Sequence, residues 1–578
     1  MQAERHNRSI LRDREPRLML ESALLGIAGA LSAQAFMWTL HGCSRLLLTG
    51  IAGYQPPGAE FGPDHQIIGP HGLWLIPLVT TLGGLLSGFL VYRFAPEAEG
   101  HGTDTVVDAF HRREGLIRPR VPPIKMVASA ITIGSGGSAG REGPIALITA
   151  GVASAYAKFA HRSEEDRRLL LLAGMAAGLS AIFRTPMGTG VFAIEVLYGN
   201  MEFEVGALLY TMISSAVAYT VNGLFVGFRP LFQLPAIPTP GFSSYALYAA
   251  LGVAAGLVGT ALPEVFYRVR DAFHLLPVPR WTKPAIGGLL LGLLALALPQ
   301  VLGGGYGWIQ LAIDGKLALH LLILLLFAKM AAFALTVSAG GSGGVFAPSL
   351  FVGAMLGGAF SLFFHQAPAI FVVVGMAAVF GAAARVPIAT MLMVTEMAGG
   401  YHLLVPAGLA VMIAYLLQVQ LSSFLRYRSL YEGQVPTRQD SPAHYLELIQ
   451  IALNLLGRRN LSLTDEVGHL DLLRLLRSHV RFDLPGGREL TMGVIPENSP
   501  VAHRRLAELY RELAQFDFEI VTIRRREHLL LPHGDTLIEP GDRLVMITSL
   551  QSRERLARYV VPVTDEPPGG VPNEAGLT

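Results

Sequence analysis

Long apolar stretches alternate with short polar connections over the first three quarters of the chain. A helix that crosses a bilayer needs about 20 residues. Apolar stretches long enough for such a helix lie near residues 21–49, 72–94, 205–226, 243–268, 284–302, 317–337 and 403–425. Shorter apolar pieces, most of them broken by Gly or Pro, lie near 123–133, 145–160, 169–183, 187–198, 345–364, 370–383 and 388–398. Broken helices at membrane depth need protein or a polar cavity over their ends, so the pattern predicts an all-helical membrane domain with half-helices around an internal site.

The apolar region contains an internal repeat. Residues 174–195 read GMAAGLSAIFRTPMGTGVFAIE, and residues 375–396 read GMAAVFGAAARVPIATMLMVTE. A Gly, an Arg, a Pro and a Glu match between the two, each pair separated by 201 residues. Upstream, GSGGSAGREGP at 134–144 has a looser echo in AGGSGGVFAPS at 339–349. Two equivalent halves with interrupted helices are typical of transporters.

The pattern changes after residue 432. A polar segment with two prolines follows, and beyond it strand and helix signals alternate. Strands are predicted at 490–495, 518–525 and 543–549, and an amphipathic helix over 499–515, with a serine cap and a proline in its first turn. These signals predict a small soluble α/β domain. The last segment, DEPPGGVPNEAGLT, has the composition of a disordered tail.

Five segments are therefore expected along the chain. They are an N-terminal segment (1–20), a membrane domain (21–435) with repeats at roughly 72–226 and 284–425, a linker and helical connector (436–487), an α/β domain (488–562) and a disordered tail (563–578).

Composition agrees with a polytopic membrane protein. The 578 residues are 51% hydrophobic and 15% charged, against about 25% charged in soluble domains, and the mean hydropathy is +0.45. The net charge of +2 is too small to indicate a nucleic-acid partner. Five arginines precede the first apolar stretch, which argues against a cleavable signal peptide and predicts a cytoplasmic N-terminus. The single cysteine, Cys43, excludes a disulfide framework within the chain.

A charged pair stands at the start of one interrupted helix. In GREGP (140–144), Gly140 and Gly143 flank Arg141 and Glu142, and the proline suits the start of a helix. Backbone amides at helix N-termini attract anions. A carboxylate at membrane depth costs several kcal/mol unless it has a partner or a task. We interpret Glu142 as a gate that competes with a mobile anion; the alternative is an Arg141–Glu142 surface ion pair in a loop.

A second motif, GGVFAP (343–348), again places glycines and a proline around a helix start. Val345 and Phe346 are apolar, so any contact with a ligand would come from their amide nitrogens. The alternative is an ordinary junction between a loop and a helix. A phosphate-binding loop is rejected because no Lys-Ser/Thr pair follows the glycines. The signal for a cation filter is weak, because a single glycine motif stands without acidic rings.

Together these motifs resemble the CLC family of chloride channels and proton-coupled anion exchangers over roughly residues 20–435. In order along the chain they are APEAEGHGTD (95–104), GREGP, RTPMGTGVFAIE (184–195), GGVFAP and SLYEGQ (429–434). The resemblance implies a CLC fold with two inverted repeats. It also implies a homodimer in which each subunit has its own anion pathway among helix N-termini.

The resemblance assigns roles to particular residues. Glu142 becomes the gating glutamate, and the amides of Val345 and Phe346 line the central anion site. Tyr431 in SLYEGQ matches a tyrosine whose hydroxyl donates to that anion. The alternative for a tyrosine at a membrane boundary is an interfacial anchor.

The chain departs from the family at the inner motif. Chloride-selective members usually read Gly-Ser-Gly-Ile-Pro where this chain has Gly-His-Gly-Thr-Asp, so His101 replaces the serine that coordinates the anion. An imidazole N–H can donate to an anion. Alternatively, His101 turns aside and only backbone amides, including that of Gly102, contact the ion. The anion preference therefore stays open.

A second departure concerns proton coupling. Proton-coupled members usually carry a glutamate directly after the position of Glu195, and here that residue is Val196. An apolar side chain cannot relay a proton, which favours channel-like conduction. The first alternative is a proton-coupled anion exchanger, since some exchangers manage without that glutamate. The second is a cation transporter controlled by the C-terminal domain.

The C-terminal domain resembles the TrkA-C type of regulatory domain found on potassium channels and transporters. The resemblance covers about residues 488–560 and rests on RRREHLLLPHGDTLIEPGDRLVMITS (524–549). It implies a small ligand or ion that regulates the attached pore, often in a dimer; the alternative is a dimerisation domain without ligand.

No metal cluster or nucleophile–base pair emerges from the sequence, so an enzyme is not expected. No cofactor is expected besides the transported chloride. The expected partners are a second copy of the chain and the lipid bilayer, in the plasma membrane of a prokaryote with both termini cytoplasmic.

Overall fold

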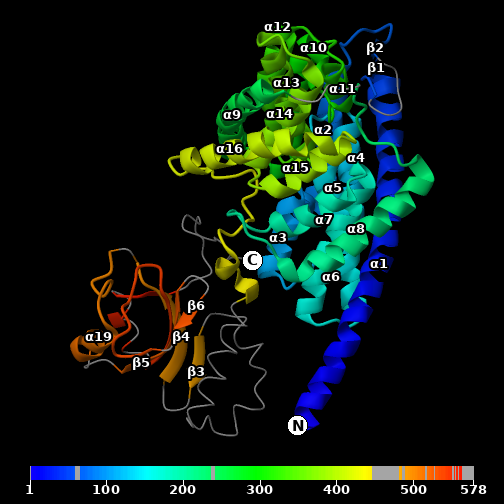
Figure 1. The fold of residues 1–578 in the computed structure, drawn as a ribbon. Helices are drawn as coiled ribbons and strands as arrows, with labels where there is room; N and C mark the ends of the chain where they lie inside the picture. The colour runs from blue at the N-terminus through cyan, green and yellow to red at the C-terminus, as the bar shows by residue number, and fades with distance from the viewer. Residues whose placement is uncertain are drawn as a thin grey trace. The chain divides into compact units, whose positions relative to one another are not determined.

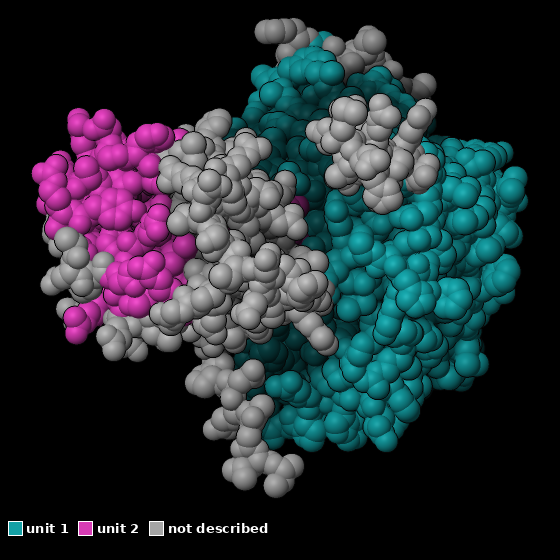
Figure 2. Space-filling view, turned by 90° about the horizontal axis from the view of Figure 1, so that it is seen from below, with its two compact units in different colours: residues 1–438 teal, residues 439–578 magenta. Residues whose placement is uncertain are grey.

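The structure is a computed structural model, and contacts within it divide the chain into two compact units, residues 1–438 and 439–578 (Figure 2). It describes residues 2–58, 65–235, 241–444 and 481–562, the last range with gaps at 485–487, 497, 514–516, 526–527, 531, 550–551, 553–554 and 557–558. Most of the predicted connector (445–480) and the predicted tail (563–578) lie outside these residues.

The first unit is a bundle of helices (Figure 1). Its first half contains α1 (Gln2–Ser44), α2 (Ile76–Phe94), α3 (Thr103–Arg112), α4 (Val121–Gly134), α5 (Glu142–Phe159), α6 (Glu164–Phe183), α7 (Pro186–Glu195) and α8 (Val205–Val226). Its second half contains α9 (Phe242–Leu275), α10 (Lys283–Ala297), α11 (Tyr306–Ile313), α12 (Leu319–Phe333), α13 (Phe346–Phe363), α14 (Pro368–Ala383), α15 (Pro387–Met397) and α16 (Leu404–Ser422). The long α1 runs along one side of the bundle and packs against α4, α5, α6 and α8.

Most predicted apolar segments correspond to helices, with two differences. Seven helices in the described part of the chain are long and apolar enough to cross a membrane, and they include α13, which we expected to be a short piece. The span predicted over 284–302 is instead a helix of 15 residues. It ends at Ala297 because Leu298, which precedes a proline, leaves the helical region with φ −134° and ψ 71°. The short helices α3 and α11 were not predicted from the apolar pattern.

The two halves of the first unit are related by a local two-fold axis. Helix α5 packs on α6 as α13 packs on α14, and α6 packs on α8 as α14 packs on α16. The carboxylate of Glu195 at the end of α7 accepts the N–H groups of Ile388 (3.1 Å) and Ala389 (2.6 Å) at the start of α15. Reciprocally, Glu396 of α15 accepts N–H groups from the first turn of α7, at 3.2 and 2.8 Å. This exchange between equivalent residues is the mark of a two-fold relation.

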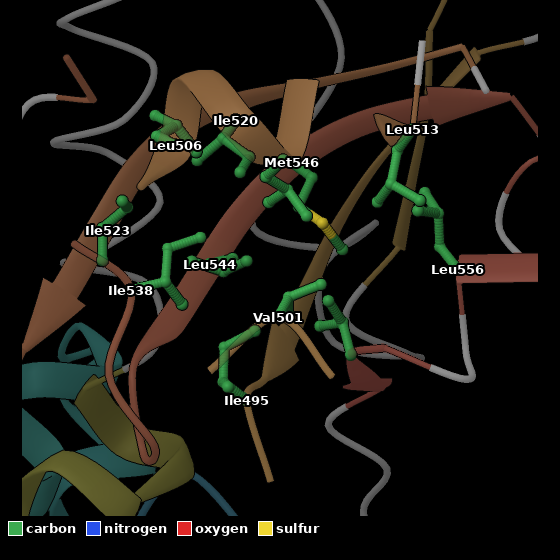
Figure 3. Close-up of a cluster of buried hydrophobic side chains, with 12 residues drawn as sticks. Ile495, Val501, Leu506, Leu513, Ile520, Ile523, Ile538, Leu544, Met546 and Leu556 are labelled. Atoms are coloured by element: carbon green, nitrogen blue, oxygen red, sulfur yellow. The ribbon is translucent and has the colours of Figure 1, made fainter. Parts of the chain in front are cut away.

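The second unit is built on an antiparallel sheet. Its order is β3 (Arg481–Leu484), β4 (Arg488–Val494), β7 (Arg543–Ser549), β5 (Phe518–Arg525) and β6 (His528–Leu530), and β8 (Val561–Pro562) pairs with β4. One face packs against α19 (Leu506–Glu512), and the core between them (Figure 3) includes Ile495, Val501, Leu506, Leu513, Ile520, Ile523, Ile538, Leu544, Met546 and Leu556.

The three predicted strands match β4, β5 and β7, but the helix predicted over 499–515 is wrong in extent. Among the described residues of this range, only Leu506–Glu512 is helical. The residues before it use their backbone groups elsewhere, because the N–H of Ile538 donates to the carbonyl of Arg504 at 2.9 Å. His503 also has a positive φ of 63°, which no regular helix accommodates.

The reciprocal carboxylates yield a stability prediction. Glu195→Ala removes two charge-assisted hydrogen bonds and leaves buried amides of α15 without acceptors, so the membrane unit should lose about 3 kcal/mol of unfolding free energy. Thermal unfolding of the purified protein in detergent measures this loss. As a control, Glu165→Ala removes an exposed carboxylate that pairs with Arg14 at 2.8 Å, and it should change stability by less than about 0.5 kcal/mol. Equal losses in the two variants would contradict the assigned role.

Candidate anion site

Two helix N-termini converge at the centre of the first unit. Gly140 and Gly344 form an antiparallel bridge in which each N–H donates to the carbonyl of the other, at 2.7 and 2.6 Å. Helix α5 begins at Glu142 and α13 at Phe346, directly after this bridge. The positive ends of both helix dipoles, with their unpaired N–H groups, therefore point toward one small volume. Such a place attracts an anion.

The side chain of Glu142 occupies this place. The residue is only 2% exposed, and its carboxylate faces the backbone amide of Ala347 in the first turn of α13. Glycine is required around it, since a Cβ at Gly140 would overlap the carboxylate and one at Gly344 would lie 2.8 Å from Oε2. The hydroxyl of Tyr306 donates to Oε1. The Glu142 carboxylate thus lies buried where α5 and α13 begin rather than in a surface ion pair. The volume that it fills is called the anion seat below.

A small cavity lies beside this carboxylate. Its volume is about 10 Å³, close to the room that one water molecule needs. The lining residues are Thr103, Glu142, Gly143, Leu179, Phe183, Phe192, Val345, Phe346, Met393 and Tyr431. They come from α3, α5, α6, α7, α13, α15 and the segment after α16. The structure therefore brings five of the predicted site residues together: Glu142, Gly143, Val345, Phe346 and Tyr431.

His101 and Gly102 do not line this cavity. His101 is buried and turns its Nε2 to the carboxylate of Asp104 at 3.0 Å, with its ring centroid 5.4 Å from that of Tyr431. Gly102 precedes α3 with a φ of 86°, and a Cβ there would come 2.8 Å from the carbonyl oxygen of Gly143. These two residues shape the start of α3, while the cavity wall itself is formed by the next residue, Thr103.

Thr103 was missed by the sequence analysis. It is the first residue of α3, and it lines the small cavity together with Tyr431. The available signal was chemical: Thr103 carries the one hydroxyl of GHGTD. A hydroxyl can donate to an anion, and Thr103 brings one to the wall of the small cavity.

A second, larger cavity of about 510 Å³ lies near the other face of the seat. Its walls come from α1, α6, α8 and the loop before α11, and include Arg141, Arg184, His41 and Tyr306. No Asp or Glu occurs among the described residues that line it. Arg141 places its guanidinium over the Tyr306 ring, 4.7 Å from the centroid. The cavity therefore offers cationic groups to an approaching anion.

Two buried lysines hold equivalent loops in the two halves. Lys125 donates to the carbonyls of Ala98 (3.0 Å) and Gly100 (2.6 Å), before α3. Lys329 donates to the carbonyls of Val301 (2.8 Å) and Gly303 (2.6 Å), before α11. Both ammonium groups are buried, and each is compensated by two backbone carbonyls of the loop that it holds. The repeat therefore extends to the starts of α3 and α11, and this could have revealed Tyr306.

Val196 lies where the segment that carries Tyr431 returns to the bundle. Its backbone carbonyl accepts a hydrogen bond from Gln434 Nε2 at 3.2 Å, and the same amide donates to the carbonyl of Ala384 at 3.1 Å. Val196 is fully buried. The neighbouring carboxylate of Glu195 is engaged by the α15 amides. Position 196 thus holds a buried apolar side chain, and the carboxylate beside it is bound to backbone amides.

Comparison with known proteins identifies both units. The profile of the voltage gated chloride channel family matches residues 83–418, and that of the TrkA-C domain matches residues 491–561. The H(+)/Cl(-) exchange transporter ClcA of Salmonella agona (strain SL483) is 31% identical over 406 residues, which cover 66% of this chain and 85% of that protein. The putative chloride channel protein ClcB-like of Ralstonia nicotianae (strain ATCC BAA-1114 / GMI1000) is 29% identical over 409 residues, which cover 68% of this chain and 92% of that protein.

Solved structures share the fold. A slow cyanobacterial Cl-/H+ antiporter superposes with a TM-score of 0.62 at 22% identity, over 76% of this chain and 98% of its own. A CLC-type fluoride/proton antiporter superposes with a TM-score of 0.61 at 22% identity, over 73% of this chain and 98% of its own. The predicted fold class, an all-helical membrane domain of inverted repeats followed by a small α/β domain, is confirmed.

Two glycine variants test the seat. In Gly140→Ala the new methyl group overlaps only the mobile end of the Glu142 side chain, so the carboxylate should be displaced and halide should bind about tenfold more tightly. Isothermal titration with chloride or bromide measures this change. In Gly143→Ala the methyl group overlaps the backbone carbonyl of His101, which cannot swing away. That variant should lose stability and gain no affinity; unchanged halide affinity in Gly140→Ala would contradict the seat.

Proposed function

The chain belongs to the voltage gated chloride channel family and is a CLC-type anion transport protein, and from this premise we propose that Glu142 gates a chloride pathway through the site described above. In the closed arrangement the Glu142 carboxylate occupies the anion seat. When it is protonated or displaced, a dehydrated chloride or a similar small anion takes its place. The transported anion is the ligand of the pathway, and the mechanism requires no cofactor.

One observation carries this proposal: the Glu142 carboxylate is buried where α5 and α13 begin. A negative charge away from water needs compensation, and here backbone amides and helix dipoles supply it. The same donors suit a halide. Because both charges cannot share one small volume, the carboxylate and the mobile anion exclude each other.

The small cavity beside Glu142 supplies the next resting place for the ion. Val345 and Phe346 offer amides at the start of α13, and Tyr431 and Thr103 offer hydroxyl groups. These neutral donors bind an anion without a full counter-charge, which lets the ion leave again. His101 then acts indirectly, by fixing the start of α3 through Asp104.

Val196 supports channel-like conduction, since a buried valine offers no group that relays a proton toward Glu142. The second candidate is a proton-coupled anion exchanger. Three similar proteins carry such an activity in their names: the ClcA relative, the cyanobacterial antiporter and the fluoride/proton antiporter. The two candidates share the Glu142 gate and differ only in whether protons are transported in exchange for the anion.

The protein is an integral membrane protein, and its wider setting follows from the same reasoning. We propose a homodimer in the plasma membrane of a bacterium, with both termini in the cytoplasm. The TrkA-C domain then lies on the cytoplasmic side, where a small molecule or ion bound to it regulates the anion pathway. An enzymatic activity is not part of the proposal.

Glutamate neutralisation tests the gate. In liposomes, chloride flux through the wild-type protein should fall about tenfold per pH unit above its midpoint, as expected for a single titrating group. Glu142→Gln should abolish this pH dependence and keep flux high, because its amide is neutral at every pH. Glu165→Gln serves as the matched control, since the Glu165 side chain is exposed and pairs with Arg14 rather than with a residue of the anion seat. Unchanged pH dependence in Glu142→Gln would refute the gate.

Simultaneous chloride and proton measurements separate the two candidates. With a chloride gradient and a potassium ionophore that carries the compensating charge, channel-like conduction predicts chloride efflux without proton uptake. A pH electrode in the external medium reports the protons and a chloride electrode the anion. Proton uptake in fixed proportion to chloride efflux would instead establish the exchanger.

A further inference from the structure

We propose that Tyr306 is an outer latch on the gate: its hydroxyl holds the ionised Glu142 carboxylate in the anion seat, and its ring separates the seat from the larger cavity. This inference rests on the proposed function of Glu142. It adds a residue from the opposite half of the molecule, at the start of α11, that positions the gating side chain.

The contacts of Tyr306 fix the ring on three sides. Its hydroxyl donates to Glu142 Oε1. One face of the ring lies under the Arg141 guanidinium, 4.7 Å from the centroid, and the ring centroid of Phe232 lies 6.3 Å away. A cation over a partly buried aromatic ring is attracted by the ring quadrupole. Arg141, which precedes Glu142 in the sequence, and Phe232, from the segment after α8, therefore hold the Tyr306 phenol against the Glu142 carboxylate.

The two cavities meet at this pair of side chains. Tyr306 lines the cavity of about 510 Å³ and Glu142 does not. Glu142 lines the cavity of about 10 Å³ and Tyr306 does not. The two sets of lining residues have no member in common. The hydrogen bond between Tyr306 and Glu142 thus joins one wall of each cavity, and an ion passing between them has to separate or displace this pair.

The loop before α11 holds Tyr306 in place. Lys329 ties down the carbonyls of Val301 and Gly303. Gly305 then turns the chain with a φ of 79°, and a Cβ there would overlap the Phe351 ring. The equivalent loop in the first half, held by Lys125, ends in Thr103 on the small cavity. The same device therefore presents a side chain to the ion pathway from each half, and in the second half that side chain is a phenol.

The strength of the latch depends on the charge of Glu142. A hydrogen bond from a phenol to an ionised carboxylate is stronger than one to a neutral carboxyl group, so protonation weakens the latch as it empties the seat. Apart from these two residues, Arg141 from the same helix start and Tyr431 from beyond α16 face the seat among the described residues. Asp104 and His101 at the start of α3 lie next to Tyr431, and Arg184 and His41 line the larger cavity with Tyr306. The elements α6, α7 and α13 present Phe183, Phe192, Val345 and Phe346 there, none of which titrates.

The decisive experiment compares two tyrosine-to-phenylalanine variants by chloride flux across a pH series in liposomes. Tyr306→Phe keeps the ring and removes the donor, so the midpoint of flux should move about one pH unit toward alkaline values, equivalent to about tenfold more flux above both midpoints. Tyr401→Phe is the matched control. Tyr401 also donates to a buried glutamate, Glu396, at 3.0 Å, but it lines neither cavity. The control should keep the wild-type midpoint.

Two further variants make the outcome decisive. Replacement of Tyr306 by 3-fluorotyrosine strengthens the donor with almost no change in size, and it should move the midpoint the opposite way, even if Tyr306→Phe does not fold. In the double variant Glu142→Gln with Tyr306→Phe, flux should equal that of Glu142→Gln alone. A wild-type midpoint in both Tyr306 variants, or the same shift in Tyr401→Phe, would overturn the latch. Persistent pH dependence in Glu142→Gln alone would instead overturn the proposed gate.

Discussion

The organisation of this protein depends on the attraction between the positive ends of two helices and one negative charge. Helices α5 and α13 can begin side by side at the centre of the bundle because Gly140 and Gly344 bridge their first residues. Two helix starts that converge in a place without water repel each other unless an anion lies between them. In the proposed mechanism, Glu142 supplies that anion while the pathway is closed, and a mobile ion supplies it when the pathway is open. The requirement for a negative charge thus serves both the stability of the fold and its function.

The same interaction recurs at the local two-fold axis, where it is permanent. Glu195 and Glu396 each bind the first amides of a helix in the opposite half. Neither lines the described cavities, so no mobile ion competes with them. A carboxylate at a helix start is therefore a structural link at two positions and, in the proposed mechanism, a movable part at a third. What distinguishes the third is the cavity next to it, since Glu396 also accepts a hydrogen bond from a tyrosine, Tyr401, but lines neither cavity.

Much of the fold could be predicted from sequence, because the signals that carry it are long or repeated. Spans such as α8 and α16 follow from apolar length alone, and the matched Gly, Arg, Pro and Glu residues revealed the two halves. The motif around Glu142 indicated the anion seat. What sequence could not provide was the short helix α11, with only eight residues, and so the proximity of Tyr306 to Glu142. Contacts between residues 164 positions apart depend on tertiary packing, and His101 turned toward Asp104 for the same reason.

The paired loops held by Lys125 and Lys329 have a further consequence. Each loop ends at a helix start that faces the ion, but one contributes a small aliphatic hydroxyl and the other a bulky aromatic one. The two halves of the scaffold are related by a local two-fold axis, whereas the side chains that the two loops present, Thr103 and Tyr306, differ. In the proposed mechanism, an ion that enters from one side meets the short Thr103 side chain, and an ion that enters from the other side meets the Tyr306 ring, which has to swing aside. Rectification of the current can therefore arise from the difference between Thr103 and Tyr306 in a scaffold whose two halves are otherwise alike.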